Sequence, residues 1–323
     1  MSLIWILAIV LFLICVLASL WLLRAWCHGQ SAGSTIKKRL DGKVVVITGG
    51  NGGIGKEVVR DLAARGARVL MLCRDLTKAN GVVEEFQQLG WTIEVRKIDL
   101  ASLASIKTCA LDLLQSEPVI DVLINNAGVM MTSSTKTEDG FDLQLMANHL
   151  GHFLLTEMLM PLLHKSAQMG HQPRIIILSS VAHAWGSIHW DDLNWERTRY
   201  NSLQAYAQSK LANILHAQKL ARVLDGSDVT VFCVHPGIVD TNLIKHLEMS
   251  FFMRCISPLA RWIIKSPAQG AETTLFCVLE DSILDRSGSY FVDCREQRPH
   301  SRALMEDDQD RLWIESMRLI ESA

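Results

Sequence analysis

The chain has 323 residues, with 32 Lys and Arg against 34 Asp and Glu, so its formal net charge is −2. This length suits one large α/β domain with short additions, and the near-neutral charge gives no support to a nucleic-acid partner. Hydrophobic residues make up 49% of the chain, which is high for a soluble enzyme.

An uncharged apolar segment at the N-terminus accounts for the excess. Residues 3–23 carry no charge, and a helix of that length spans roughly 30 Å, the thickness of a bilayer core. A cleaved signal peptide normally starts with basic residues, but here the first basic residues follow the segment; they are Arg24, Lys37, Lys38 and Arg39. Basic flanks stay in the cytosol. We therefore predict a transmembrane anchor at residues 1–24, most simply in the endoplasmic reticulum, a linker at 25–40 and a single cytosol-facing domain at 41–323.

The eight cysteines agree with a reduced compartment. Cys73, Cys233 and Cys277 lie in apolar runs, and no two cysteines have the spacing of a metal site. We expect buried, reduced thiols and no bound metal.

From Lys43 onward, apolar runs alternate with helix-length segments. The predicted strands cover residues 44–47, 68–72, 92–98, 122–124, 174–178 and 229–234. The helical segments between them include residues 56–65, 77–88 and 103–115. Strands that alternate with helices indicate a parallel sheet with helices on both faces, and continuous apolar runs are typical of strands buried on both faces.

A glycine-rich segment, TGGNGGIGKE at residues 48–57, follows the first predicted strand. A triphosphate-binding P-loop needs Ser or Thr after its Lys to hold magnesium, but Lys56 is followed by Glu57. The T-G-x-x-x-G-x-G spacing of residues 48–55 suits a dinucleotide-binding turn instead, in which a helix N-terminus offers free N–H groups to a pyrophosphate. Taken alone, such a turn is weak evidence, and a glycine-rich structural turn is the alternative.

Five further motifs follow in order, and they are NNAG at 125–128, NHLGHF at 148–153, SS at 179–180, YAQSK at 206–210 and HPGIVDT at 235–241. Together with the glycine turn they resemble the short-chain dehydrogenase/reductase family over about residues 41–295. SSVAH and NHLGHFLLT, with the apolar N-terminus, are most similar to its retinol dehydrogenase branch. The resemblance implies an α/β, doubly wound Rossmann fold with a mainly parallel seven-stranded sheet.

Tyr206 and Lys210 lie four residues apart and therefore on one helix face. A phenol with a pKa near 10 is a poor acid–base at neutral pH, and a neighbouring ammonium group is expected to lower that pKa. The resemblance implies that Tyr206 transfers the proton, that Lys210 also holds the nicotinamide ribose, that Ser180 hydrogen-bonds the substrate oxygen and that Asn148 completes a proton relay. Taken singly, Ser180 could be a strand-end cap and Asn148 a polar helix contact.

The resemblance also implies a set of cofactor-binding residues, which are Thr48, Gly49, Gly50, Asn51, Gly52, Gly53, Ile54, Gly55, Arg74, Asp99, Leu100, Asn126, Ala127, Gly128, Tyr206, Lys210, Pro236, Gly237, Ile238 and Thr241. An NAD enzyme places an acidic residue at the end of the second strand, but here Cys73 is followed by Arg74, which suits a 2′-phosphate. Lys56 adds positive charge beside the turn. Asp75 could bind the ribose, or could cap the next helix. We expect NADPH rather than NADH, and hence carbonyl reduction as the favoured direction.

The substrate side is predicted to be apolar. Residues 243–264 are rich in aromatic residues and Met and contain Pro258, which suits a lid, placed at about 238–266, or an interfacial helix. Trp185, Trp190 and Trp195 suggest a substrate-side loop, with surface packing as the alternative.

The remaining histidines of these motifs, His149, His152 and His183, are expected to pack or to form hydrogen bonds. We expect a hydrophobic substrate, retinal first, then a lipid-derived aldehyde or a steroid ketone. The alternative from another class is a non-catalytic, cofactor-binding scaffold on a membrane. A homodimer, common in the family, is an open alternative to a monomer.

Overall fold

The computed structural model describes residues 3–29, 32–240, 262 and 264–323. Thr241 and most of the predicted lid lie outside the described residues. The described helices of the domain are α2 (Gly53–Ala64), α3 (Leu76–Gln87), α4 (Leu103–Ser116), α5 (Leu143–Leu145), α6 (Gly151–Gln168), α7 (Ser202–Val223), α10 (Pro267–Leu279) and α11 (Glu306–Glu321). A π-helical turn, Met146–Leu150, joins α5 to α6, and two 3₁₀ turns cover Val181–Trp185 and Ser301–Leu304.

One sheet forms the centre of the domain. Its strands are β1 (Val44–Thr48), β2 (Arg68–Cys73), β3 (Ile93–Lys97), β4 (Val122–Asn125), β5 (Arg174–Leu178), β6 (Thr230–His235), β7 (Tyr290–Val292) and β8 (Arg295–Gln297), in the order 3-2-1-4-5-6-7-8. All neighbours are parallel except β7 and β8, which are antiparallel. The doubly wound α/β prediction is confirmed, but the predicted count of seven strands is wrong, because β8 is a short, exposed strand at the sheet edge.

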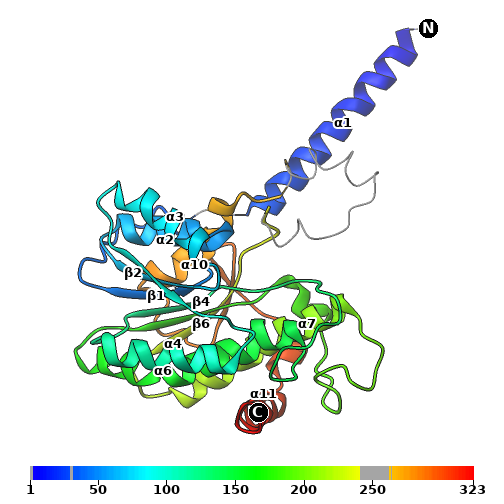
Figure 1. Cartoon of the computed structure of the whole chain (residues 1–323). Coiled ribbons are helices and arrows are strands. Elements are labelled where there is room, and N and C mark those ends of the chain that lie inside the picture. Colours follow the sequence, from blue (N-terminus) through cyan, green and yellow to red (C-terminus); the bar gives the residue numbers. More distant parts are fainter. Residues whose placement is uncertain (1–2, 30–31, 241–261, 263) are drawn as a thin grey trace.

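The helices cover both faces of the sheet, as the continuous apolar strands require. Along β1, Val44 and Val46 face one hydrophobic core while Val45 and Ile47 face the other. Figure 1 shows α2, α3 and α10 on one side of the sheet and α4, α6 and α7 on the other. The strand order reverses between β1 and β4, so a crevice is expected at the carboxyl ends of these two strands.

The N-terminal helix α1 (Leu3–His28) points away from the domain (Figure 1). The structure does not describe the side chains of residues 3–10, 13, 26 and 27. Over the part of the chain that is described, no helix reaches the length and apolar character needed to cross a membrane. The membrane anchor therefore stays a prediction from the sequence.

The predicted linker packs against the domain where it is described. The Ser34 hydroxyl donates to the Glu272 carboxylate on α10 at 2.6 Å, and the Ser34 amide donates to the same group at 3.0 Å. At the C-cap of α2, the Arg65 guanidinium donates to the carbonyls of Ser34 and Lys38 at 3.2 and 3.1 Å. Residues 34–38 are thus held between two helices of the domain and are not a free spacer.

Candidate active site

The glycine turn between β1 and α2 depends on glycine for its shape. Gly49 and Gly53 have φ angles of +68° and +53°, which L-residues with a side chain rarely adopt. A Cβ on Gly55 would lie 2.3 Å from the Gly49 carbonyl oxygen, so only glycine permits this close approach of the helix to the turn. The strand–turn–helix context expected of a dinucleotide-binding turn is present.

Thr48 lies beneath the turn and is fully buried. Its hydroxyl accepts hydrogen bonds from the backbone amides of Asn126 and Ala127 at 3.0 and 2.9 Å, and it lies 2.8 Å from His152 Nε2. The Asn126 side chain donates to the Thr48 carbonyl at 2.8 Å. Thr48, predicted as a cofactor contact, therefore joins the glycine turn to the loop after β4 and supports the site from below.

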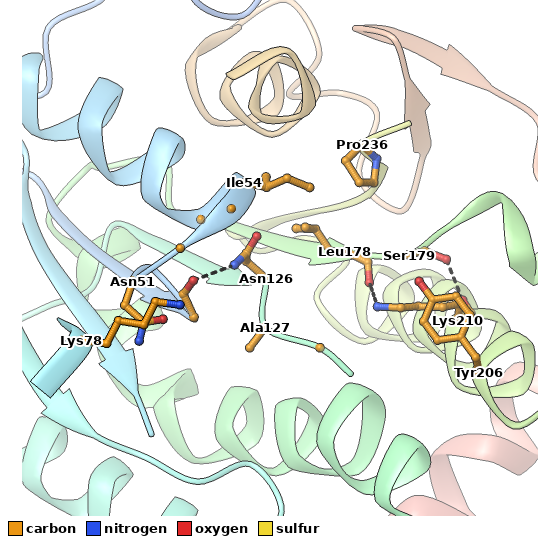
Figure 2. Close-up of a pocket in the computed structure, with 15 residues that line it drawn as sticks. Asn51, Ile54, Lys78, Asn126, Ala127, Leu178, Ser179, Tyr206, Lys210 and Pro236 are labelled. Atoms are coloured by element: carbon orange, nitrogen blue, oxygen red, sulfur yellow. Dashed lines mark hydrogen bonds between the residues drawn. The ribbon is translucent and has the colours of Figure 1, made fainter. Parts of the chain in front are cut away.

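A cleft of about 290 Å³ runs from the glycine turn to Tyr206 and Lys210 (Figure 2). Its lining consists of Gly49, Asn51, Gly52, Gly53, Ile54, Gly55, Lys78, Asn126, Ala127, Gly128, Leu178, Ser179, Tyr206, Lys210 and Pro236. Twelve of these were predicted from the sequence, and Lys78, Leu178 and Ser179 were missed. Of the other predicted residues that the structure describes, those outside this lining are Thr48, Gly50, Arg74, Asp99, Leu100, Asn148, Ser180, Gly237 and Ile238.

One end of the cleft fits an anion. Helix α2 begins after Gly52 without a side-chain cap on its first N–H groups, and a helix N-terminus of this kind attracts phosphate. The ammonium group of Lys78, on α3, lies 3.2 Å from the position of a Cβ on Gly52. A phosphate group of a dinucleotide fits this combination of free amides, absent side chains and positive charge.

The charges around the second strand differ from the sequence expectation. Lys56, predicted to face a 2′-phosphate, instead contacts the Glu85 carboxylate at 2.5 Å, because its position on α2 points it towards α3. Asp75 caps α3, and its carboxylate accepts the Lys78 amide at 3.0 Å, so the capping alternative is confirmed. Arg74 follows β2 and is exposed. Of Lys56, Arg74 and Lys78, only Lys78 lines the cleft.

The other end of the cleft holds the predicted acid–base pair. The Lys210 ammonium donates to the Leu178 carbonyl at 3.2 Å and lies 5.7 Å from the centre of the Tyr206 ring. Burial lowers the pKa of Lys210 to about 8. Burial raises the pKa of Tyr206, and a hydrogen bond with Ser180 offsets only part of this effect. The expectation of a lowered phenol pKa is therefore wrong for the ligand-free site, because desolvation exceeds the effect of the Ser180 hydrogen bond.

Asn148 lies in the π-helical turn and is fully buried. Its amide group donates to the Val129 carbonyl and to the Ser209 hydroxyl, both at 2.9 Å, and its side-chain oxygen accepts the Val129 amide at 2.8 Å. These bonds hold the loop after β4 against α7. A Cβ on Gly128 would lie 3.0 Å from the Asn148 side-chain oxygen. Because glycine has no side chain, room is left in the cleft beside Lys210.

The three histidines behave as predicted from the sequence, by packing and hydrogen bonding. His152 bridges the Asn148 carbonyl at 3.1 Å and the Thr48 hydroxyl. His183 contacts the Ser180 carbonyl at 2.7 Å and accepts the backbone amide of His300 at 3.1 Å. Within the described ranges, no group of His, Cys, Asp and Glu is arranged to hold a metal ion.

A model of the short chain dehydrogenase family matches residues 43–250, which is more than half of the chain. The chain belongs to the short-chain dehydrogenase family. This short-chain dehydrogenase is 46% identical to retinol dehydrogenase 11 of Homo sapiens, over 87% of each chain. It is 41% identical to retinol dehydrogenase 13 of Homo sapiens, over 88% of its own length and 86% of that protein. The chain is therefore an oxidoreductase.

Solved structures agree on the fold of this short-chain dehydrogenase. An uncharacterised protein from Mycobacterium paratuberculosis is 32% identical and superposes with a TM-score of 0.71, over 91% of this chain and 98% of that one. Two more distant structures are each 23% identical: a gluconate 5-dehydrogenase from Beutenbergia cavernae with bound NADP and a 3-ketoacyl-(acyl-carrier-protein) reductase from Brucella melitensis complexed with NADH. Their TM-scores are 0.62 and 0.61, over 79% and 78% of this chain and 96% of theirs. The same fold thus holds either coenzyme.

Proposed function

We propose that the protein uses NADP(H) to interconvert a hydrophobic alcohol and its carbonyl form, with retinol and retinal as the first candidate pair and reduction as the favoured direction. The observation that carries this proposal is the cleft itself. Its anion-binding end lies at the start of α2, and its other end holds Tyr206 beside Lys210. The names of the two curated relatives support retinoids as the first substrates to test.

The proposed chemistry assigns one proton to Tyr206. The nicotinamide, when bound, supplies the hydride in reduction and accepts it in oxidation. The Tyr206 hydroxyl gives its proton to the substrate oxygen in reduction and takes a proton back in the reverse direction. Ser180, which is hydrogen-bonded to Tyr206, orients that oxygen.

Lys210 serves the same step through its position. Its ammonium group lies between the Leu178 carbonyl and the Tyr206 ring, at the end of the cleft where a nicotinamide ribose would lie. With a pKa of about 8, Lys210 carries its charge at neutral pH and can stabilise a phenolate in Tyr206. Asn148 holds the loop that contains Gly128 against this pair, and we propose that it completes a proton relay with Lys210.

The preference for NADP(H) is supported by the charges at the adenosine end. Arg74 and Lys78 lie on either side of Asp75, whose carboxylate is already occupied by the cap of α3. A carboxylate used in this way is poorly placed to accept both ribose hydroxyls, whereas the two cations suit a 2′-phosphate. We propose that the coenzyme contacts also include the other predicted residues, namely Gly50, Asp99, Leu100, Gly237, Ile238 and Thr241, of which Thr241 lies outside the described residues.

A hydrophobic substrate is supported by apolar side chains around Ser180 and Tyr206. Val181 and Trp185 begin and end the 3₁₀ turn after Ser180 and are 39% and 59% exposed. Leu203 precedes Tyr206 by about one helical turn and is 43% exposed. Met130 packs against the cluster formed by Ala182, Tyr206 and Ala207. Exposed large apolar residues near a reactive group favour a hydrophobic ligand.

We also propose that α1 anchors the protein in a membrane, with the endoplasmic reticulum as the first compartment to test and the domain on the cytosolic side. The support is the uncharged sequence of residues 3–23, the basic residues that follow it, and five apolar side chains of α1 that are more than 60% exposed, namely Leu11, Phe12, Leu17, Trp21 and Leu22. Protease protection of the domain in microsomes would contradict the orientation. A homodimer stays a prediction.

The test is turnover by the purified full-length chain. All-trans-retinal, a medium-chain lipid aldehyde and a steroid ketone are offered with NADPH and, separately, with NADH. We expect retinal reduction with NADPH and a loss of at least about 100-fold in Tyr206→Phe, because the phenolic proton is removed while the ring is kept. Absence of any turnover in the unmutated chain, or full activity in Tyr206→Phe, would rule out the proposed chemistry and favour the cofactor-binding scaffold.

A further inference from the structure

An ion pair with a buried lysine lies beside the loop after β6, whose Pro236 lines the cleft. Lys265 precedes α10, and its ammonium group pairs with the carboxylate of Asp293, in the turn between β7 and β8. The Lys265 side chain is only 1% exposed, whereas that of Asp293 is 26% exposed. Burying a lysine to this degree costs free energy unless its charge is paired. We therefore expect this ion pair to have a role other than keeping the surface soluble.

Lys265 is bonded to the loop after β6 through its backbone and touches it through its side chain. Its amide donates to the Ile238 carbonyl at 2.9 Å, and its carbonyl accepts the Asp240 amide at 2.9 Å. Gly237 has a φ of +89°, and a Cβ there would lie 2.8 Å from Lys265 Cδ and 3.0 Å from its Nζ. The lysine side chain therefore runs along the backbone of the residue that follows Pro236, which lines the cleft.

The N-terminal segment covers the other side of the ion pair. Gly29 has a φ of +58°, and a Cβ on it would lie 2.1 Å from the carboxylate carbon of Asp293. Nearby, the His28 ring contacts the Gln269 side chain at 3.0 Å, and Gln269 forms a capping box with Ser266, the residue after Lys265. A continuous chain of contacts thus runs from Gly29 through Asp293 and Lys265 to Gly237.

The charge of Lys265 also reaches the residues behind the cleft. Burial first, and then the positive charge of Lys265, lower the pKa of His235, the last residue of β6, to about 4. Asp293 acts in the opposite direction, and His183 and Lys210 also contribute. His235 stays neutral at physiological pH and its Nδ1 accepts the Gly237 amide at 3.4 Å.

We propose that Lys265 and Asp293 are positioning residues for the coenzyme, which fix the backbone of Pro236–Ile238, and that the N-terminal segment at Gly29 completes this device. The inference rests on the proposed function, since it takes this loop to contact the nicotinamide half of NADP(H). It assigns to the N-terminal segment a part in coenzyme binding in addition to its part in connecting α1 to the domain.

The first test separates positioning from simple stability. A single substitution leaves one charge buried without its partner and destabilises the fold, so the informative variant is Lys265→Met with Asp293→Asn, which removes both charges. For this full-length double variant we expect unfolding within a few degrees of the unmutated protein but about tenfold weaker NADPH binding by fluorescence titration, because the loop loses its fixed position. The loss is expected mainly in KM for NADPH and less in kcat. An ion pair with a purely structural role would lower the active fraction, and hence kcat, while KM stayed unchanged.

The second test addresses the N-terminal segment. Gly29→Ala places a methyl group on the Asp293 carboxylate and is expected to weaken NADPH binding about fivefold. Gly90→Ala is the matched control, because Gly90 has a φ of +77° but nothing within 4 Å of a Cβ, so it shares the backbone strain without the contact. NADPH affinity within twofold of the unmutated value in both the double variant and Gly29→Ala would overturn the inference. An unmutated chain that binds neither NADPH nor NADH would instead overturn the proposed function itself.

Discussion

The Lys78 ammonium group lies 3.2 Å from the point where a Cβ on Gly52 would stand, at the start of α2. Lys56, which precedes it in the sequence and is closer to the glycine turn, contacts Glu85 instead. Of these two lysines, the one that faces the cleft is therefore supplied by α3. This assignment can be tested because the other lysine provides an internal control.

Lys78→Gln is expected to weaken NADPH binding by at least about tenfold, since a hydrogen bond to a charged group contributes roughly 1.5–3 kcal/mol. NADH binding should weaken much less if Lys78 binds the 2′-phosphate. Arg74→Ala is expected to act in the same direction. Lys56→Gln is the control, expected to change NADPH affinity by less than about twofold because only an exposed ion pair is lost. Fluorescence titration with both coenzymes measures all three; equal losses in the Lys56 and Lys78 variants would contradict the assignment.

Gly55→Ala is expected to disrupt the turn. The added methyl group would lie 2.3 Å from the Gly49 carbonyl oxygen, and a backbone shift of this kind costs about 1–3 kcal/mol. NADPH binding should be lost together with stability. Gly81→Ala is the matched control, because Gly81 lies within α3 with nothing within 4 Å of a Cβ, and it should stabilise the protein by roughly 0.5–1 kcal/mol. Urea unfolding and coenzyme titration of both variants check this; a Gly55→Ala protein with normal NADPH affinity would show that the close approach is not required.

Lys210 is expected to give the ligand-free protein a distinctive pH dependence. Its folded-state pKa of about 8 is below the ordinary value of 10.5. Below pH 8 Lys210 is protonated in both the folded and the unfolded chain. The folded chain then bears the full cost of burying the ammonium group, which is about 3 kcal/mol. Between pH 8 and 10.5 only the unfolded chain still holds that proton, so this contribution makes the free energy of unfolding rise with pH.

Lys210→Met is therefore expected to be more stable than the unmutated protein at pH 7, by up to about 3 kcal/mol, and the difference should close by pH 10.5. Such a variant would be more stable than the unmutated protein but would lose catalytic activity. Urea unfolding at several pH values without coenzyme measures the difference. A gap that stays constant from pH 7 to 10.5 would show that burial of the charge is not its cause.

The sequence predicted most of the sheet because the strands β1, β2, β4, β5 and β6 are short, continuous apolar runs that alternate with helix-length segments, as is typical of a sheet covered on both faces. It did not predict β7 and β8, which have three residues each and no useful periodicity. Local spacing also predicted that Tyr206 and Lys210 would share one helix face, because the i, i+4 relation does not depend on the rest of the fold.

The parts of the site that the sequence did not predict depend on how separate elements pack. Whether Lys56 or Lys78 faces the cleft is decided by the rotation of α2 against α3, which no local pattern specifies. Likewise, the pKa of Tyr206 depends on its burial. Tyr206 packs with Met130 and Ala182, and these three residues come from separate segments of the chain. By contrast, the capping role of Asp75 was among the alternatives drawn from the sequence, because it depends only on an amide three residues further along the chain.

A cluster of buried histidines beneath α11 gives the last prediction. His149 Nε2 lies 3.0 Å from the Ser316 hydroxyl on α11, and the His149 and His216 rings are 5.8 Å apart. Trp313, also on α11, packs against Phe153 at 4.9 Å. Burial lowers the pKa of His149 to about 4 and that of His216 well below its ordinary value of 6.5, and the mutual proximity of the rings lowers the latter further.

Because the unfolded chain takes up these protons near pH 6.5 and the folded chain does so only near pH 4 or below, stability should fall as the pH falls from 6.5 to 4. His149 alone would account for about 3 kcal/mol at the lower end. The double variant His149→Gln with His216→Gln should therefore lose less stability between pH 7 and pH 4.5 than the unmutated protein. Ser316→Ala, which removes a hydrogen bond but no titrating group, should lower stability by about 1 kcal/mol at both pH values. Urea unfolding, with hydrogen exchange of the α11 amides as a local readout, measures these slopes; equal slopes in the double variant and the unmutated protein would mean that other groups drive acid unfolding.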